Sequence, residues 1–142
     1  MQTINHLLQN KGSHVETITA DTSVYDALAI MAEKGIGALV VLQDARPVGL
    51  FSERDYARNI ILKGRASKLT PVAEVMSSQV LVAHPDQSVE ECMAIMTEKR
   101  VRHLPVMQDG SLVGIISIGD LVKAIIENQQ FMIEQLVSYI NG

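Results

Sequence analysis

The pattern of apolar and polar residues divides the chain into short extended runs and longer helical segments. Two apolar runs, each followed by a polar turn and a second apolar run, predict two strand pairs: residues 38–42 with 48–51, and residues 104–107 with 112–116. Shorter extended runs at residues 15–19 and 80–83 precede them.

Amphipathic helices are predicted between these runs. Each begins after an Asp-x-Ser signal and carries apolar residues at helical spacing: Val24, Ala27, Leu28 and Met31 in the first, Val89, Cys92, Met93 and Met96 in the second. Gly35 ends the first helix, since glycine adopts the left-handed conformation at little cost. Further helices are expected after Ser52 and Ser117, and residues 63–70 are expected to form a linker.

The chain contains an internal duplication. When it is shifted by 65 residues, positions 13–60 align with 78–125 without a gap, and 19 of these 48 positions are identical. Two unrelated αβ units would not easily keep one register over this length. Each copy therefore has the same predicted order of elements, β-α-β-β-α.

Composition and charge exclude several classes of protein. The net charge of −4, with both signs mixed along the chain, gives no basic footprint for nucleic acid. The single Cys92 excludes an internal disulfide and has no partners at zinc-ligand spacing. No apolar run approaches the ~20 residues that cross a bilayer, and residues 1–10 do not have the pattern of a signal peptide. We therefore expect a soluble, cytoplasmic protein with no membrane partner.

Each copy closes with Gly-apolar-apolar-Ser-x-x-Asp, at residues 49–55 and 114–120, after the strands at 36–41 and 101–106. This unit resembles the CBS module, and the resemblance covers nearly the whole chain. It implies an α+β fold of two modules packed about a pseudo-two-fold axis, with two clefts between them. Module 1 would span residues 1–67 with an N-terminal helix, and module 2 residues 68–142 with an extended C-terminal helix. The pair resembles small stand-alone bacterial CBS-domain proteins, which implies a regulatory adenine-nucleotide sensor and not an enzyme.

The chemistry of the closing motif suits a nucleotide. A serine at a strand-helix junction places its hydroxyl beside backbone N–H groups that favour a phosphate, and an aspartate three residues later can accept from two ribose hydroxyls. Gly49 and Gly114 would leave room at the strand, where the next apolar residues can face an adenine. Ser-x-x-Asp is also a helix cap worth ~1 kcal/mol without any ligand. Because the motif occurs twice in register, we expect the site, with the cap operating when the site is empty.

Cations near the motifs are candidates for the phosphates. The resemblance implies that Arg102 and His103, at the start of a strand, point toward a ligand, and Arg54 lies inside the first motif. Lys11 is a weaker candidate that flanks the clefts by register. Surface charge is the alternative role for all four. The full set of expected nucleotide-binding residues is Lys11, Ile36, Gly37, Ala38, Leu50, Ser52, Arg54, Asp55, Val80, Val101, Arg102, His103, Ile115, Ser117 and Asp120.

Several alternatives stay open from the sequence. AMP is the favoured ligand, while NAD(H), ATP, ADP and S-adenosylmethionine are not excluded, and no catalytic cofactor or metal is expected. A ligand-free interaction module and a nucleotide-processing enzyme are the competing functions, although no nucleophile-base pair or P-loop supports the enzyme. A homodimer is expected through the last helix, from about Gly119 to Ile140, and the downstream protein partner is unknown. The side chains expected at that interface are Leu121, Ile125, Met132, Leu136 and Ile140, with Tyr56, Ile60 and Ile61.

Overall fold

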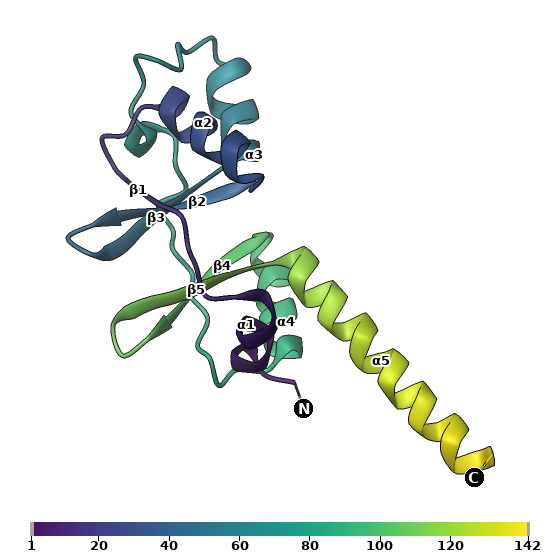
Figure 1. The fold of residues 1–142 in the computed structure, drawn as a ribbon. Helices are drawn as coiled ribbons and strands as arrows, with labels where there is room; N and C mark the ends of the chain where they lie inside the picture. The colour runs from purple at the N-terminus through teal and green to yellow at the C-terminus, as the bar shows by residue number, and fades with distance from the viewer. Residues whose placement is uncertain (1, 142) are drawn as a thin grey trace. The chain divides into compact units, whose positions relative to one another are not determined.

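The computed structural model describes residues 2–141, which form two compact units (Figure 1). The first-repeat unit consists of His14–Leu81 together with Asp109–Val113. The second-repeat unit consists of the residues up to Ser13, Val82–Gln108, and the residues from Gly114 onward. Helices and strands alternate in both, which confirms the predicted α+β class.

The first-repeat unit is built on a three-stranded sheet. Its elements are β1 (Thr17–Thr19), α2 (Val24–Lys34), β2 (Ala38–Gln43), β3 (Arg46–Ser52), α3 (Glu53–Tyr56), the π-helical turn η1 (Ala57–Ile61) and the 3-10 turn η2 (Val72–Glu74). The sheet order is β1-β2-β3, with β1 parallel and β3 antiparallel to the central β2. The predicted strand pair 38–42 with 48–51 is therefore confirmed.

Local sequence signals explain the position of α2 in this unit. The hydroxyl of Ser23 accepts from Asp26 N–H at the start of the helix, and Gly35 takes the left-handed conformation at its end with φ 65°. The helical spacing of its apolar residues places Val24, Ala27 and Met31 in the core. They pack there with Ile18, Leu39, Val41, Phe51, Ile60, Val72 and Val75.

The expected linker is tied to α2 by backbone hydrogen bonds. Val24 N–H donates to Thr70 O at 2.8 Å, and Tyr25 N–H donates to Ser67 O at 3.0 Å. These bonds satisfy two of the N–H groups that a helix start leaves without an intrahelical acceptor.

The second-repeat unit repeats this arrangement with differences at its edges. It contains α1 (Ile4–Lys11), α4 (Val89–Lys99), β4 (His103–Gln108), the part of β5 (Ser111–Ser117) from Gly114 onward, and α5 (Ile118–Asn141). Strand β4 pairs with β5. The predicted extended run at 80–83 is wrong as a strand: only Ala83 pairs, in an isolated parallel bridge to Val106.

The N-terminal helix corrects the predicted module composition. Sequence order assigns α1 to the first module, but it packs in the second-repeat unit. Ile4 N–H donates to Gln87 O at 2.9 Å and Asn5 N–H to Pro85 O at 2.8 Å. Its apolar face, with Leu7 and Leu8, is buried. The division between residues 67 and 68 itself stays a prediction.

Helix α5 changes character along its length. Its first turns bury Leu121 and Ala124, whereas every residue from 126 to 141 is exposed. In Figure 1 this part of α5 extends beyond the other helices of its own unit. Among residues 2–141, no helix combines the length and apolar character that a membrane span requires.

Candidate functional site

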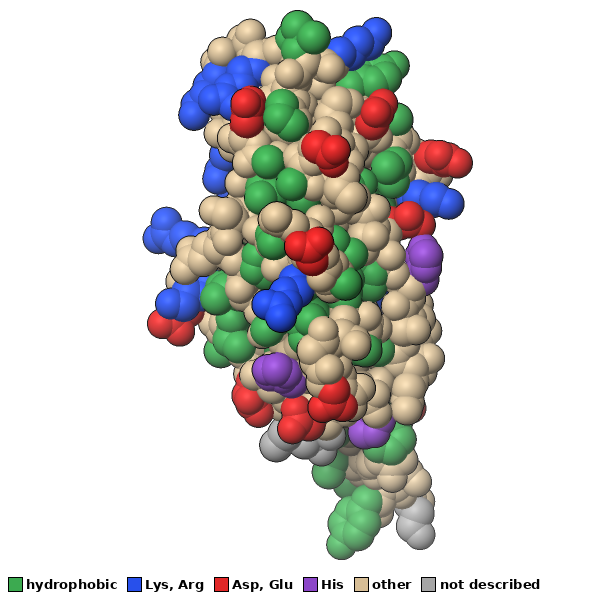
Figure 2. Space-filling view, turned by 90° about the vertical axis from the view of Figure 1, so that its left-hand side faces the viewer, with side chains coloured by type: hydrophobic (Ala, Val, Ile, Leu, Met, Phe, Trp, Pro, Cys, Tyr) green, Lys and Arg blue, Asp and Glu red, His purple; other side chains and the backbone are tan. Residues whose placement is uncertain are grey.

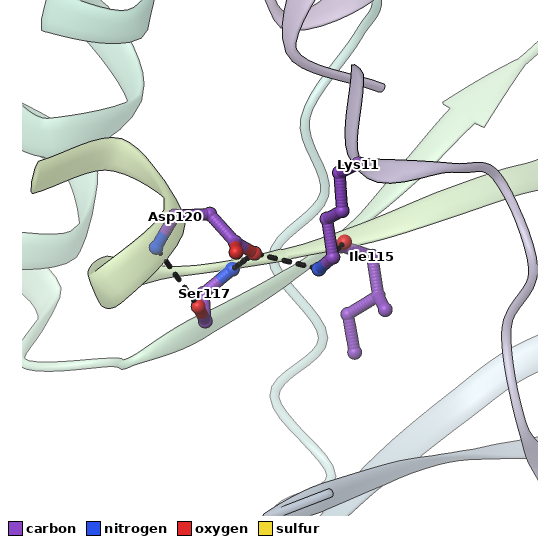
Figure 3. Close-up of polar contacts among 4 residues, drawn as sticks. All are labelled: Lys11, Ile115, Ser117 and Asp120. Carbon is purple, nitrogen blue, oxygen red and sulfur yellow. Dashed lines mark hydrogen bonds and ion pairs between the residues drawn. The ribbon is translucent and has the colours of Figure 1, made fainter. Parts of the chain in front are cut away.

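The second motif lies at the junction of β5 and α5. Ser117 Oγ accepts from Asp120 N–H at 3.1 Å, and Ser117 N–H donates to Oδ2 of Asp120 at 2.8 Å (Figure 3). This reciprocal pair is a capping interaction, so the predicted cap at this position is confirmed. Within residues 2–141, Oδ1 of Asp120 accepts no hydrogen bond.

A lysine from α1 reaches the same carboxylate. Lys11 Nζ donates to Oδ2 of Asp120 at 2.6 Å and to the backbone O of Ile115 at 2.6 Å (Figure 3). The Lys11 side chain is 33% exposed and that of Asp120 is 25% exposed, so water screens the pair only in part. The structure thus brings four predicted site residues together: Lys11, Ile115, Ser117 and Asp120.

These contacts set the charge of Asp120. Partial burial alone would raise the pKa of its carboxyl, but the hydrogen bonds from Lys11 and Ser117 and the charge of Lys11 outweigh burial and lower the pKa. A group with a lowered folded-state pKa stabilises the folded protein above its unfolded pKa. That contribution is lost as the pH falls through the lowered value. Asp120 is therefore ionised at neutral pH.

The first motif has the same cap without the lysine. Ser52 Oγ accepts from Asp55 N–H at 3.3 Å, and Ser52 N–H donates to Oδ2 of Asp55 at 2.9 Å. Ser52 Oγ also donates to Oδ2 at 3.1 Å. Within residues 2–141, neither oxygen of Asp55 meets a cation, and Oδ1 accepts no hydrogen bond.

The helices that follow the two motifs differ in length. Helix α3 has four residues and continues as a π-helical turn, whereas α5 has 24 residues. Because the dipole of a helix needs several aligned turns, an anion is favoured more at Ser117 than at Ser52.

The motif glycines serve packing. A Cβ on Gly114 would lie 2.7 Å from a methyl of Leu8, and a Cβ on Gly49 would collide with Met76 Sδ. The expectation that these glycines leave room for a ligand is therefore wrong, because neighbouring side chains already fill that room.

The expected phosphate cations lie beside the motif backbone. Arg102 is exposed and His103 half-buried at the start of β4, and Arg102 O accepts from Ile118 N–H at 2.9 Å. Gly37 is the register counterpart of Arg102, and its O accepts from Glu53 N–H at 3.1 Å. Within residues 2–141, neither Arg54 nor Arg102 forms an ion pair. On the face shown in Figure 2, basic, acidic and apolar side chains are interspersed.

The other predicted residues are aliphatic and differ in exposure. Ala38 is buried in β2, which removes its side chain from solvent. The others are half-buried: Ile36, Leu50 and Val80 in the first-repeat unit, and Val101 in the second.

Sequence reasoning missed Ser77. Its backbone forms a bridge with Leu50, with N–H···O distances of 2.9 Å in both directions. Its register counterpart is Gly12, beside Lys11, so extending the repeat backward past residue 13 would have indicated this position.

Cys92 lies in the core and carries no reactive character. Burial, with a smaller effect from Glu91, raises the pKa of its thiol to about 11. Because only the thiolate is an effective nucleophile, this residue is an unreactive core side chain at neutral pH. Among residues 2–141, no group of three or more His, Cys, Asp or Glu side chains could hold a metal ion.

Comparisons with known proteins place these motifs in a family context. A family model described as "CBS domain" matches residues 12–62 and again 72–127. The two matches follow the two halves of the internal duplication.

Individual relatives agree with this match. The mitochondrial CBS domain-containing protein CBSX3 of Arabidopsis thaliana is 36% identical over 99% of this chain and 72% of its own length. A protein with CBS domains from Burkholderia ambifaria, named for a proposed role in signal transduction, has a TM-score of 0.86 at 49% identity, covering 90% of this chain and 96% of its own. A hexameric CBS-CP12 protein from cyanobacteria has a TM-score of 0.76 at 29% identity, covering 84% of this chain and 66% of its own.

Proposed function

The chain belongs to the CBS-domain family, and we propose that it is a regulatory CBS-pair protein whose two motifs each bind an adenine nucleotide. The observation that carries the proposal is the state of the motif carboxylates. In both Asp55 and Asp120 the serine fixes Oδ2, while Oδ1 accepts no hydrogen bond within residues 2–141. A fixed carboxylate with an available oxygen is an acceptor for ribose hydroxyls.

The phosphate would be held by groups outside the carboxylate. Arg102 and His103 support this role at the second motif, and Arg54 supports it at the first. A phosphate near Ser117 would also be stabilised by the start of α5. Because only a few cations lie near the motifs, we expect AMP or a dinucleotide to be favoured over ATP. We propose binding and not catalysis, since the sequence offers no nucleophile-base pair.

Titration calorimetry of the whole chain with AMP tests the ribose assignment. Asp120→Asn and Asp55→Asn keep the size of the side chain and remove the charged acceptor, whose hydrogen bond is worth ~1.5–3 kcal/mol. Each variant should therefore lose at least roughly tenfold in affinity at its own motif. The matched control is Asp86→Asn, an exposed aspartate outside both motifs. Unchanged affinity in both motif variants would overturn the assignment.

We also propose that the protein is a homodimer held by the exposed part of α5. Eight apolar side chains in this part are at least 48% exposed: Ile126, Phe131, Met132, Ile133, Leu136, Val137, Tyr139 and Ile140. Val122, one turn earlier, is 43% exposed. In proteins most of the stability of a helix comes from packing of its apolar face, so packing against a partner would stabilise this part of α5.

The spacing along α5 indicates which partner fits. Ile126, Ile133 and Ile140 repeat every seven residues, and Gln129 and Leu136 lie three residues after Ile126 and Ile133. Val122, four residues before Ile126, has the same heptad position as Gln129 and Leu136. Isoleucine at the first heptad position with leucine at the fourth favours pairing of two helices, and Ile133 with Leu136 has this pattern. In a parallel pair of α5 helices, Gln129 of one chain would lie beside Gln129 of the other. We therefore commit to a second copy of this chain.

Two residues that the sequence predicted at the dimer surface, Leu121 and Ile60, do not lie on it. Leu121 and Ile60 are 0% and 1% exposed because each packs in the core of its own unit. Ile61 remains 59% exposed, and Tyr56 is half-buried against the core. The cytoplasmic location and the downstream protein stay predictions.

A further inference from the structure

The two motifs differ at one charged contact. Lys11 Nζ lies 2.6 Å from Oδ2 of Asp120 and 2.6 Å from the O of Ile115. The lysine is 109 residues from Asp120 in sequence, so packing of α1 in the second-repeat unit creates the contact. Within residues 2–141, no other cation pairs with a motif carboxylate.

In the first motif, the backbone carbonyl that corresponds to Ile115 O accepts its hydrogen bond from a backbone N–H and not from a lysine. Leu50 is the register counterpart of Ile115, and its O accepts from Ser77 N–H at 2.9 Å. The register counterpart of Lys11 is Met76, which packs on Gly49 instead. An ammonium group thus replaces a backbone N–H in the second repeat, and the carboxylate gains a counter-ion that Asp55 lacks.

This counter-ion competes with part of the proposed ligand. Each carboxylate oxygen has two lone pairs, and Ser117 N–H and Lys11 Nζ together take both of those on Oδ2 of Asp120. A ribose that bonds to Oδ2 as well as to Oδ1 must therefore displace Lys11. A ligand that carries a phosphate offers the displaced ammonium a new anion. A neutral nucleoside offers none, so it would separate a partly buried ion pair without replacing it.

From this contact we propose that Lys11 is a specificity-determining residue, which makes the second motif select phosphorylated nucleotides over nucleosides while the first motif discriminates less. This inference rests on the proposed nucleotide-binding function. Lys11 acts as a counter-ion for Asp120 without ligand and as a counter-ion for the ligand phosphate afterwards. The step is an exchange of ion pairs, with no bond made or broken.

The test measures AMP and adenosine affinities separately at each motif. Calorimetry on Asp55→Asn reports the second motif, and calorimetry on Asp120→Asn reports the first. We expect the preference for AMP over adenosine to be larger at the second motif. In the Asp55→Asn background, Lys11→Met should lower that preference by about tenfold, the size of one charge-assisted hydrogen bond. The substitution introduces the residue found at the register counterpart.

Matched controls separate this effect from general changes. Lys99→Met removes another lysine at a helix end of the same unit, and it should leave the preference unchanged. Lys11→Gln should lower the preference for AMP as Lys11→Met does. Agreement between the two variants would show that loss of the charge, and not packing of the methionine, is the cause. Circular dichroism verifies that each variant is folded.

The possible failures are distinguishable. If AMP binds and depends on Asp120 but Lys11→Met and Lys11→Gln keep the preference, the role of Lys11 is overturned and the proposed function stands. An equal loss in Lys99→Met also overturns it. If neither AMP nor adenosine binds any variant or the unmodified chain, the proposed function fails and this inference fails with it.

Discussion

At Gly114, strand β5 passes so close to α1 that the glycine has a packing role. A Cβ there would lie 2.7 and 2.9 Å from the two methyl carbons of Leu8, which is itself buried. We expect Gly114→Ala to lower the free energy of unfolding by about 1–3 kcal/mol, as overpacking of a core does. Urea denaturation followed by circular dichroism measures this.

Gly119 provides the control for that substitution in the same motif. Its added Cβ would meet only Ser117 Oγ, at an ordinary 3.6 Å, and the residue lies in the first turn of α5. Gly119→Ala should be neutral or raise stability by up to about 1 kcal/mol. Equal losses in both variants would show that the close approach to Leu8 is not the cause.

At the scale of single residues, the sequence predicted the serine and aspartate of each motif, and it named Lys11 only as a cation for a phosphate and not as the partner of Asp120. Ser117 and Asp120 are three residues apart, so a local rule for helix starts places them together. Lys11 meets Asp120 only because α1 packs in the second-repeat unit, and this packing is a non-local contact that no spacing encodes. The same reason explains why Leu8 and Met76 were not expected beside the glycines.

Helix α4 begins at a cap that can be compared with the equivalent cap of α2 in the first repeat. Ser88 is 4% exposed, accepts from Glu91 N–H at 3.0 Å, and forms a reciprocal capping box with that residue. Ser88→Ala should lower the free energy of unfolding by about 1–2 kcal/mol, because it removes the cap and leaves the Glu91 N–H without its acceptor.

Its register counterpart Ser23 caps α2 with one side-chain bond, from Asp26 N–H at 3.1 Å, and is more exposed. Ser23→Ala should therefore have the smaller effect in the same denaturation experiment. If Ser23→Ala lowered the free energy of unfolding more than Ser88→Ala does, burial and the capping box would not be what makes the Ser88 cap the stronger one.

Element prediction succeeded where the periodicity was strong and failed at the ends of the repeats. The strand pairs and the helices that begin after Ser23 and Ser88 follow directly from apolar spacing and cap residues. After Ser52 only four residues are α-helical, and Leu62 N–H donates to Ala57 O, five residues back. The widened turn also lets Asn59 Nδ2 donate to Val75 O at 3.3 Å. An apolar pattern does not distinguish such a turn from an α-helix.

For the whole molecule, the exposed half of α5 decides whether the chain acts alone. Ile133 and Phe131 are both 59% exposed, yet residues two apart point to nearly opposite sides of a helix. Ile133 lies in the heptad seam with Ile126 and Ile140, and Phe131 lies outside it. A charge at residue 133 would have to be buried between two helices, whereas a charge at residue 131 would stay in water.

We therefore expect the unmodified chain to sediment at micromolar concentration as a species of twice 15.5 kDa. Ile133→Glu should shift it to the 15.5 kDa monomer, and Phe131→Glu should leave the dimer intact. Glutamate is a good helix former, so neither substitution should unwind α5, which circular dichroism verifies. Runs with and without AMP show whether nucleotide changes the association. A monomer under every condition would remove the dimer, and dissociation by both substitutions would place the contact on a different face of α5.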